Sequence, residues 1–296
     1  HLYIIMDFTK LFTFVIIAFF SLSSCKNTKD TTDETPNFLI IMVDDMGYSD
    51  PGCYGGEIQT LNIDRLAENG LRFTQFYNAA RCCPTRAALL TGVYQHTAGL
   101  ANNGQSLTNN VVTIAEVLQQ NGYQTGMTGK WHLSRTKALD DRDKQLLWLS
   151  HRLDSGRFAP IETYPSNRGF DEHYGVIWGV VNFFDPFSFV YNEKEIEDVP
   201  EDFYITDFIT EKSVEMINNF TKNNDPFFLY VAHTAPHWPL HALEEDIQKY
   251  DGKYDDGWDK LRETRYERQL EIGLFEPETT PLAKNESEVA WDSYEH

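Results

Sequence analysis

The first residues suited to chemistry are two adjacent carboxylates, Asp44 and Asp45, which directly follow a run of apolar residues. Neighbouring carboxylates at the end of a buried strand repel each other and lose hydration. A hard cation with oxygen ligands relieves both costs. A solvated turn accounts for the Asp-Asp-Met-Gly sequence as well. The pair therefore indicates a metal site only together with other residues.

A second segment, residues 82–86 with the sequence Cys-Cys-Pro-Thr-Arg, places a thiol where a helix is expected to begin near Pro84. A helix N-terminus offers unpaired N–H groups and positive potential, which suit a tetrahedral anion. Unmodified, Cys82 is a candidate for a thiolate of lowered pKa, with Arg86 about one turn further on. The alternative is a pair of structural cysteines beside a helix cap.

Polar side chains also follow two later apolar runs. Lys130 and His132 come after the first of these, and His233 and His237 come after the second. The carboxyl ends of parallel strands gather at one edge of a sheet, where ligands of such folds bind. The sequence thus predicts an active site at this edge.

The elements that position these residues alternate between strands and helices. Thr113 and Glu116 have the spacing of a capping box, and residues 38–43 read as a strand buried on both faces. This alternation predicts an α/β layered fold with a large, mostly parallel central sheet flanked by helices. Strands are expected at 38–43, 71–77, 124–128 and 227–231, and helices at 63–69 (closed by Gly70), 85–91, 113–120, 207–219, 244–250 and 258–272.

Composition limits the partners of the chain. The 296 residues carry a formal net charge of -20, and 41% of them are hydrophobic. A surface this acidic argues against binding to nucleic acid or to an anionic membrane.

The first 36 residues are expected to lie outside the fold. Residues 11–22 form an apolar run that is too short for a membrane span and that ends beside Cys25. Residues 1–25 therefore read as a signal peptide with a bacterial lipobox, or as an ordinary cleaved signal, and residues 26–36 as a flexible tether. We expect an exported protein, periplasmic or at the cell surface, with a lipid anchor on Cys25. Of the other cysteines, Cys53 and Cys83 either pair or stay as buried thiols.

The motif Cys82-x-Pro84-x-Arg86, followed by Ala-Ala-Leu-Leu-Thr-Gly, resembles the signature of type I sulfatases. Further segments resemble that family in the same order along the chain, and the resemblance covers roughly residues 37–285. The last of them, with the residues up to 281, is similar to bacterial arylsulfatases in particular. These segments are 37–47, 129–132, 167–175 and 235–240.

The resemblance implies an alkaline-phosphatase-like fold and a hydrolase of sulfuric esters. A maturation enzyme would oxidise Cys82 to formylglycine, whose hydrate carries two hydroxyls on one carbon, one to attack sulfur and one to expel sulfate. The resemblance assigns Asp44, Asp45 and residue 82 to a divalent metal, Ca²⁺ with Mg²⁺ as the alternative. Arg86 would orient the hydrate.

The same resemblance assigns the substrate contacts. Lys130 would bind a sulfate oxygen, and His132 would contact the hydrate and the substrate and act as a base. His237 would bind sulfate and help to protonate the leaving alcohol, whereas His233 is expected to be a neighbouring or core histidine. Five aromatic residues either line an aryl or sugar pocket or pack in the core: Trp131, Trp178, Phe183, Phe184 and Trp238.

The family's metal site also requires a later Asp-Asn pair, and a second lysine contacts sulfate. No Asp-Asn-Gly follows His237. We therefore expect residues 37–296 to be the N-terminal, truncated part of a catalytic domain that is inactive alone. Two alternatives stay open: a phosphate or phosphonate monoester hydrolase with the same site, and a non-catalytic surface lipoprotein that binds sulfated ligands.

Overall fold

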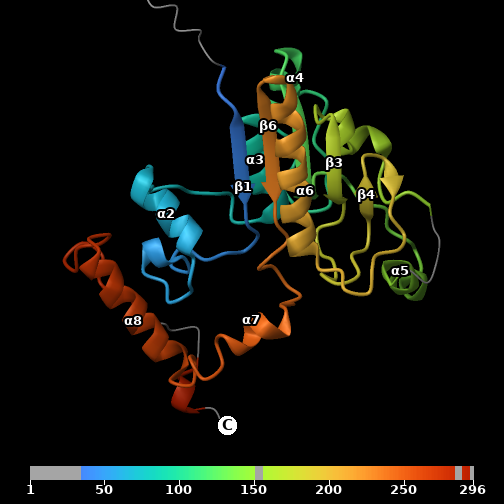
Figure 1. The fold of residues 1–296 in the computed structure, drawn as a ribbon. Coiled ribbons are helices and arrows are strands. Elements are labelled where there is room, and N and C mark those ends of the chain that lie inside the picture. The colour runs from blue at the N-terminus through green and yellow to red at the C-terminus, as the bar shows by residue number, and fades with distance from the viewer. Residues whose placement is uncertain (1–34, 151–155, 284–288, 294–296) are drawn as a thin grey trace, which may run out of the picture. The chain divides into compact units, whose positions relative to one another are not determined.

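The computed structural model describes residues 35–150, 156–283 and 289–293 (Figure 1). The chain divides into two compact units, residues 1–36 and 37–296, and all the helices and strands below belong to the second. The predicted signal peptide, its lipobox and most of the predicted tether lie outside the described residues. Within the described residues, no helix is long and apolar enough to cross a membrane.

The described residues form one six-stranded sheet in the order β1-β6-β2-β3-β4-β5. The first four strands of this order run parallel, and β4 and β5 are antiparallel additions at one edge. The predicted α/β fold with a mostly parallel sheet is therefore confirmed. The strands are β1 (Phe38–Met42), β2 (Gln124–Lys130), β3 (Glu172–Val176), β4 (Phe189–Tyr191), β5 (Lys194–Glu195) and β6 (Phe227–Ala232).

Strand β6 lies between β1 and β2, and all six of its residues are buried. Its side chains alternate between two hydrophobic cores: Phe228 and Tyr230 belong to one, and Leu229 and Val231 to the other. An uninterrupted apolar strand is what a sheet covered on both faces requires.

Helices cover the two faces of the sheet (Figure 1). The helices α3 (Cys82–Thr91) and α4 (Ile114–Gln120) contribute to the core that holds Phe228, whereas α6 (Ile205–Phe220) contributes to the opposite core. The predicted capping box is present at the start of α4. The layers are thus helix, sheet and helix.

The remaining helices lie outside these two groups, at several points along the chain. Arg265 of the last long helix pairs with Asp50 and with Glu57, each at 2.7 Å, and so ties that helix to the segment after β1. These helices are α2 (Leu61–Asn69), α5 (Arg142–Leu149), α7 (Glu244–Gln248) and α8 (Gly257–Glu271), with short 3₁₀ turns η1 (Gly52–Tyr54), η2 (Ile161–Thr163), η3 (Pro165–Asn167), η4 (Thr221–Asn223) and η5 (Trp291–Ser293).

Two local predictions were wrong. Residues 71–77 form no strand, because among the described residues no strand pairs with them, and Phe76 and Tyr77 are exposed. Strand β1 is present but not buried on both faces: within the described sheet it is an edge strand, and Leu39 and Ile41 are about half exposed. The predicted closure of α2 by Gly70 is confirmed, and this glycine has an extended conformation.

Two glycines let β2, β3 and β6 approach one another where the polar residues follow. A Cβ atom on Gly175 of β3 would lie 1.9 Å from the carbonyl oxygen of Gly129 in β2. A Cβ atom on Gly129, whose φ is 89°, would lie 2.0 Å from the carbonyl oxygen of Ala232. Only glycine meets both requirements, the positive φ and the close backbone.

Replacing Gly129 by alanine should therefore lower the free energy of unfolding by about 3 kcal/mol or more, since it combines a clash with a left-handed backbone. Gly122→Ala is the matched control, because Gly122 has a φ of 83° but open space around its Cβ position, and it should cost only about 1 kcal/mol. Urea unfolding of both variants measures the difference. Equal losses would show that the close approach of β2 and β6 does not matter.

Candidate functional site

The candidate site lies where β1, β6 and β2 end side by side. In the sheet register, Met42 of β1 and Gly129 of β2 both face Ala232 of β6. Beyond the strands, the amide of Asp44 donates to the carbonyl of Ala235 (3.0 Å), and the amide of His233 donates to the carbonyl of Met42 (2.8 Å). The predicted meeting of the polar segments at one sheet edge is confirmed.

Asp44 is buried between two buried cations. Its side chain contacts the ammonium of Lys130 and lies 3.5 Å from Arg86 Nη2. Asp44 is 4% exposed, Lys130 1% and Arg86 0%. Charged groups this deep are tolerated only when they are paired. Burial and the nearby Arg86 lower the pKa of Lys130, and Asp44 opposes that shift.

Arg86 reaches from α3 beneath the strand ends. Its Nη1 donates to the carbonyl of Lys130 (2.8 Å) and to the hydroxyl of Tyr230 (3.2 Å). Its Nε and Nη2 have no hydrogen-bond partner among the described residues. Buried donors without partners are costly, so this guanidinium retains capacity for an oxygen-rich group.

Cys82 is the first residue of α3. The helix therefore begins earlier than the sequence predicted, which was a start near Pro84 and a helix over residues 85–91. Its N-cap residue, Arg81, makes no side-chain capping bond. The thiol is half-buried and donates to Asn103 Oδ1 at 3.8 Å. The predicted position at a helix N-terminus is confirmed.

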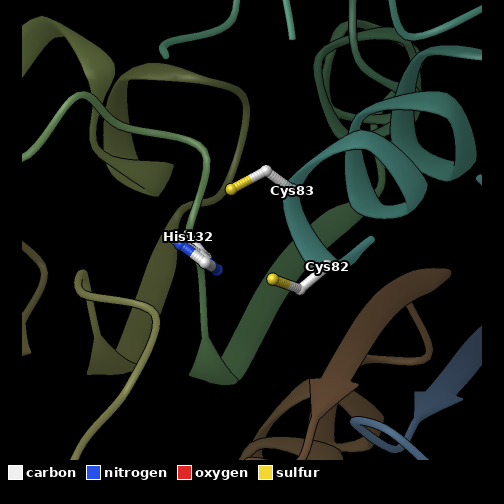
Figure 2. A group of neighbouring side chains, drawn as sticks. All are labelled: Cys82, Cys83 and His132. Atoms are coloured by element: carbon white, nitrogen blue, oxygen red, sulfur yellow. The ribbon is translucent and has the colours of Figure 1, made fainter. Parts of the chain in front are cut away.

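Both thiols of the Cys82–Cys83 pair point toward His132 (Figure 2). One ligand atom from each of these three residues lies within 4.8 Å of those from the other two. A hydrogen bond from Cys83, and then the nearby His132 and Lys130, lower the pKa of the Cys82 thiol against the effect of burial. The same bond to Cys82, together with burial, raises the pKa of the Cys83 thiol.

His132 follows β2 in a left-handed backbone conformation, with φ at 56°. Its ring lies against Gly179, where a Cβ atom would come within 2.1 Å of Cε1. Burial lowers the pKa of His132, and the hydrogen bond with Cys82 only partly offsets this. The imidazole is therefore neutral near pH 7 and able to accept a proton.

Asp45 and His237 form a second, more exposed pair beside this cluster. His237 Nε2 lies 3.5 Å from Asp45 Oδ2, and the Asp45 side chain is 63% exposed. His233 is more enclosed: its Nδ1 is buried without a partner among the described residues, and burial lowers its pKa.

Among the described residues, the ligand atoms of Cys82, Cys83 and His132 all lie within 4.8 Å of one another. The predicted metal ligands Asp44, Asp45 and Cys82 do not form such a group. Asp44 and Asp45 nevertheless suit a hard cation, because each carboxylate oxygen has two lone pairs and the ion pairs of Asp44 leave some of them free. The metal assignment stays a prediction.

A residue 82 with two hydroxyls would fit its surroundings. The free donors of Arg86 and the partnerless Nδ1 of His132 are buried polar atoms, of the kind that such oxygens would satisfy. The observation supports a modified residue 82 without testing it.

Sequence reasoning missed three residues of the site. The sequence carried one signal for Tyr230, a hydroxyl within an otherwise apolar strand, and none for Asn103 and Gly179.

Of the five aromatic candidates, Trp131 and Phe183 are core residues, Trp178 packs against the core, and Phe184 and Trp238 are exposed. The described cysteines, Cys53, Cys82 and Cys83, are all free.

Comparison with known proteins identifies the family of the chain. The sequence model of the Sulfatase family matches residues 36–287. An uncharacterized sulfatase of Schizosaccharomyces pombe is 33% identical over 285 residues, which are 86% of this chain and 47% of that protein. An arylsulfatase of Klebsiella aerogenes is 30% identical over 282 residues, 88% of this chain and 55% of that protein. The chain thus spans about half the length of the curated relatives it matches.

Solved structures also resemble the fold of this chain. A crystal structure of Ps i-CgsB in complex with k-i-k-neocarrahexaose has a TM-score of 0.60 and 28% sequence identity. The match covers 81% of this chain and 52% of that chain.

Asp44→Asn should lower the free energy of unfolding by about 3–5 kcal/mol, because it leaves Lys130 and Arg86 buried without a counter-charge. Asp246→Asn is the matched control: it removes a carboxylate from an exposed ion pair with Lys249 and should leave the urea midpoint unchanged. Both are measured with a chelator present. Equal midpoints for the two variants would contradict the role of Asp44.

In the unmodified chain, with a chelator present, iodoacetamide should label Cys82 before Cys53 or Cys83. The lowered pKa keeps Cys82 as thiolate as the pH falls, whereas burial raises the pKa of Cys53. Between pH 8 and pH 6 the rate at Cys53 should fall about tenfold per pH unit, and that at Cys82 should stay nearly constant. Peptide mass spectrometry follows each site; parallel pH profiles would refute the assignment.

Proposed function

Because the chain belongs to the sulfatase family, we propose that the protein carrying it hydrolyses sulfate monoesters through a formylglycine made from Cys82. One observation carries the proposal. Cys82, within the family's Cys-x-Pro-x-Arg motif, stands at the uncapped N-terminus of α3 and faces His132, with Lys130 nearby. A helix N-terminus and a cation favour the negative charge of a sulfate ester at this point.

When present, formylglycine supplies a hydrated aldehyde with two hydroxyls on one carbon, one as nucleophile and one for the release of sulfate. His132, whose lowered pKa keeps it neutral, takes the proton of a hydroxyl at residue 82. Arg86 would orient that hydroxyl through Nε, the donor that Lys130, Tyr230 and Asp44 leave free.

Lys130 offsets the charge of the sulfate oxygens. Its ammonium has three donors, and the contact with Asp44 takes one of them. Asp44 therefore fixes the direction of the amine while the other N–H groups stay available. Such preorganised charge lowers the barrier, since nothing has to reorient during the reaction.

Asp44 and Asp45 would hold a divalent cation, for which we propose Ca²⁺ with Mg²⁺ as the alternative. The ion would add positive charge beside residue 82. His237, 3.5 Å from Asp45, would bind sulfate and protonate the leaving alcohol from the more exposed side of the site.

For the substrate we propose small aryl or alkyl sulfate esters, on the likeness to the Klebsiella aerogenes arylsulfatase. The exposed Trp238, next to His237 in the chain, offers a flat face for a ring. The likeness to a structure solved in complex with k-i-k-neocarrahexaose makes a sulfate ester of a sugar the second substrate to compare.

Maturation and location are also proposals. A formylglycine-generating enzyme would act on residues 82–86, and the short apolar run before Cys25 supports export to the periplasm or the cell surface with a lipid anchor. Globomycin-sensitive processing and labelling with a radioactive fatty acid would test the anchor, and a Cys25→Ala variant that still takes the label would refute it.

The activity is tested on the protein that carries this chain, produced with its maturation enzyme. Nitrophenyl sulfate should be cleaved in preference to nitrophenyl phosphate. Cys82→Ala should abolish turnover, and His132→Ala should lower kcat by about 10²–10⁴-fold. Cys53→Ser is the control, since Cys53 lies outside the site, and should retain full activity. Cleavage by Cys82→Ala would contradict the nucleophile, and preference for the phosphate would favour a phosphate monoester hydrolase.

A further inference from the structure

Before Cys82 is modified, the site presents two thiols and an imidazole to the same point (Figure 2). We infer that the unmodified chain binds one Zn²⁺ through Cys82, Cys83 and His132. This site differs from the proposed Asp44–Asp45 cation site, and it belongs to the chain before maturation rather than to the sulfatase reaction.

The distances suit a single zinc ion. Zinc binds thiolate sulfur at about 2.3 Å and imidazole nitrogen at about 2.0–2.1 Å, so two sulfurs on one tetrahedral zinc lie roughly 3.7 Å apart. The three ligand atoms here already lie within 4.8 Å of one another. Small side-chain rotations bring them to zinc geometry, and a fourth position stays open for water.

The backbone around the three ligands is fixed. Cys82 and Cys83 occupy the first turn of α3, and His132 lies two residues after the end of β2. The left-handed backbone of His132 and the close fit of its ring against Gly179 set the direction of the imidazole. Ligands held by a helix and a strand lose little freedom when the metal binds.

His132 also supplies an independent sign of a missing partner. Its Nδ1 is buried and has no hydrogen-bond partner among the described residues. A ring nitrogen of this kind is satisfied when its lone pair binds a metal, or when it carries a proton and donates it in a hydrogen bond to an acceptor. A neutral imidazole keeps a lone pair on one of its two ring nitrogens, and that lone pair can bind a metal.

The charges favour zinc over a harder cation at this point. Cys82 is already a thiolate near neutral pH, so binding releases one proton, from Cys83, and the two thiolates balance the charge of Zn²⁺. The helix N-terminus and Lys130 favour the thiolate form of Cys82, and Asp44 offsets the repulsion between Lys130 and the metal. Sulfur and imidazole select Zn²⁺, whereas carboxylates such as Asp44 and Asp45 select Ca²⁺.

Maturation would end zinc binding. Conversion of Cys82 to formylglycine removes one of the two sulfurs and leaves Cys83 and His132, too few ligands for a stable site. Zinc content therefore distinguishes the unmodified chain from the modified one. Bound zinc would also protect both thiols from alkylation.

The test uses the unmodified full chain, made in a host without the maturation enzyme, with Zn²⁺ alone as the probe in calorimetry. One Zn²⁺ should bind per chain, more tightly as the pH rises because Cys83 releases a proton. Co²⁺ in the same site should give a thiolate charge-transfer band. Cys82→Ala, Cys83→Ala and His132→Ala should each weaken Zn²⁺ binding about 100-fold or more, and the two cysteine variants should also weaken the cobalt band.

Cys53→Ser and Asp45→Asn are the matched controls and should bind Zn²⁺ as the unsubstituted chain does. Thermal unfolding of the apo forms shows which variants are folded, and protection of Cys82 from iodoacetamide by Zn²⁺ gives a second readout in the unsubstituted chain. Absence of binding, binding that survives Cys83→Ala, or binding lost in Asp45→Asn would overturn the inference. Zinc binding by the unmodified chain, whether present or absent, does not bear on sulfate ester hydrolysis, which is measured on the modified protein.

Discussion

The buried carboxylate of Asp44 is the charge on which the rest of the site depends. Lys130 and Arg86 are both buried, and two like charges without a counter-ion at this depth would be expelled or neutralised. Asp44 pairs with both and so joins the ends of β1 and β2 to α3. This single interaction fixes the cations that face residue 82, which lies on the same helix as Arg86.

The chemistry at residue 82 follows from where the backbone places it. Helix α3 begins at Cys82 without a side-chain cap, and β2 ends at Lys130, two residues before His132, which lies beside Cys82. The same surroundings suit two chemical states of the residue. A thiolate with Cys83 and His132 would make a soft metal site, and an oxygen-bearing residue would meet the unpartnered donor of Arg86. Which state is present decides which chemistry is available.

The sequence was sufficient where local patterns decide the structure. The apolar run at 227–231 and the capping box at Thr113 predicted a buried strand and a helix start, because neither depends on distant residues. Alternation at 71–77 predicted a strand that did not form, since a strand also needs a neighbour to pair with. In the site, the motif residues were found by type and spacing. Tyr230 and Gly179 were missed because their roles arise only when separate segments meet.

The most direct test of the account is the mass of the tryptic peptide that spans residues 82–86, taken from protein made with the maturation enzyme. The account predicts that residue 82 has lost its thiol and carries an aldehyde that reacts with hydrazine. An intact Cys82 thiol under those conditions would contradict it, because no hydroxyl-bearing residue would then stand at the N-terminus of α3 to attack a sulfate ester.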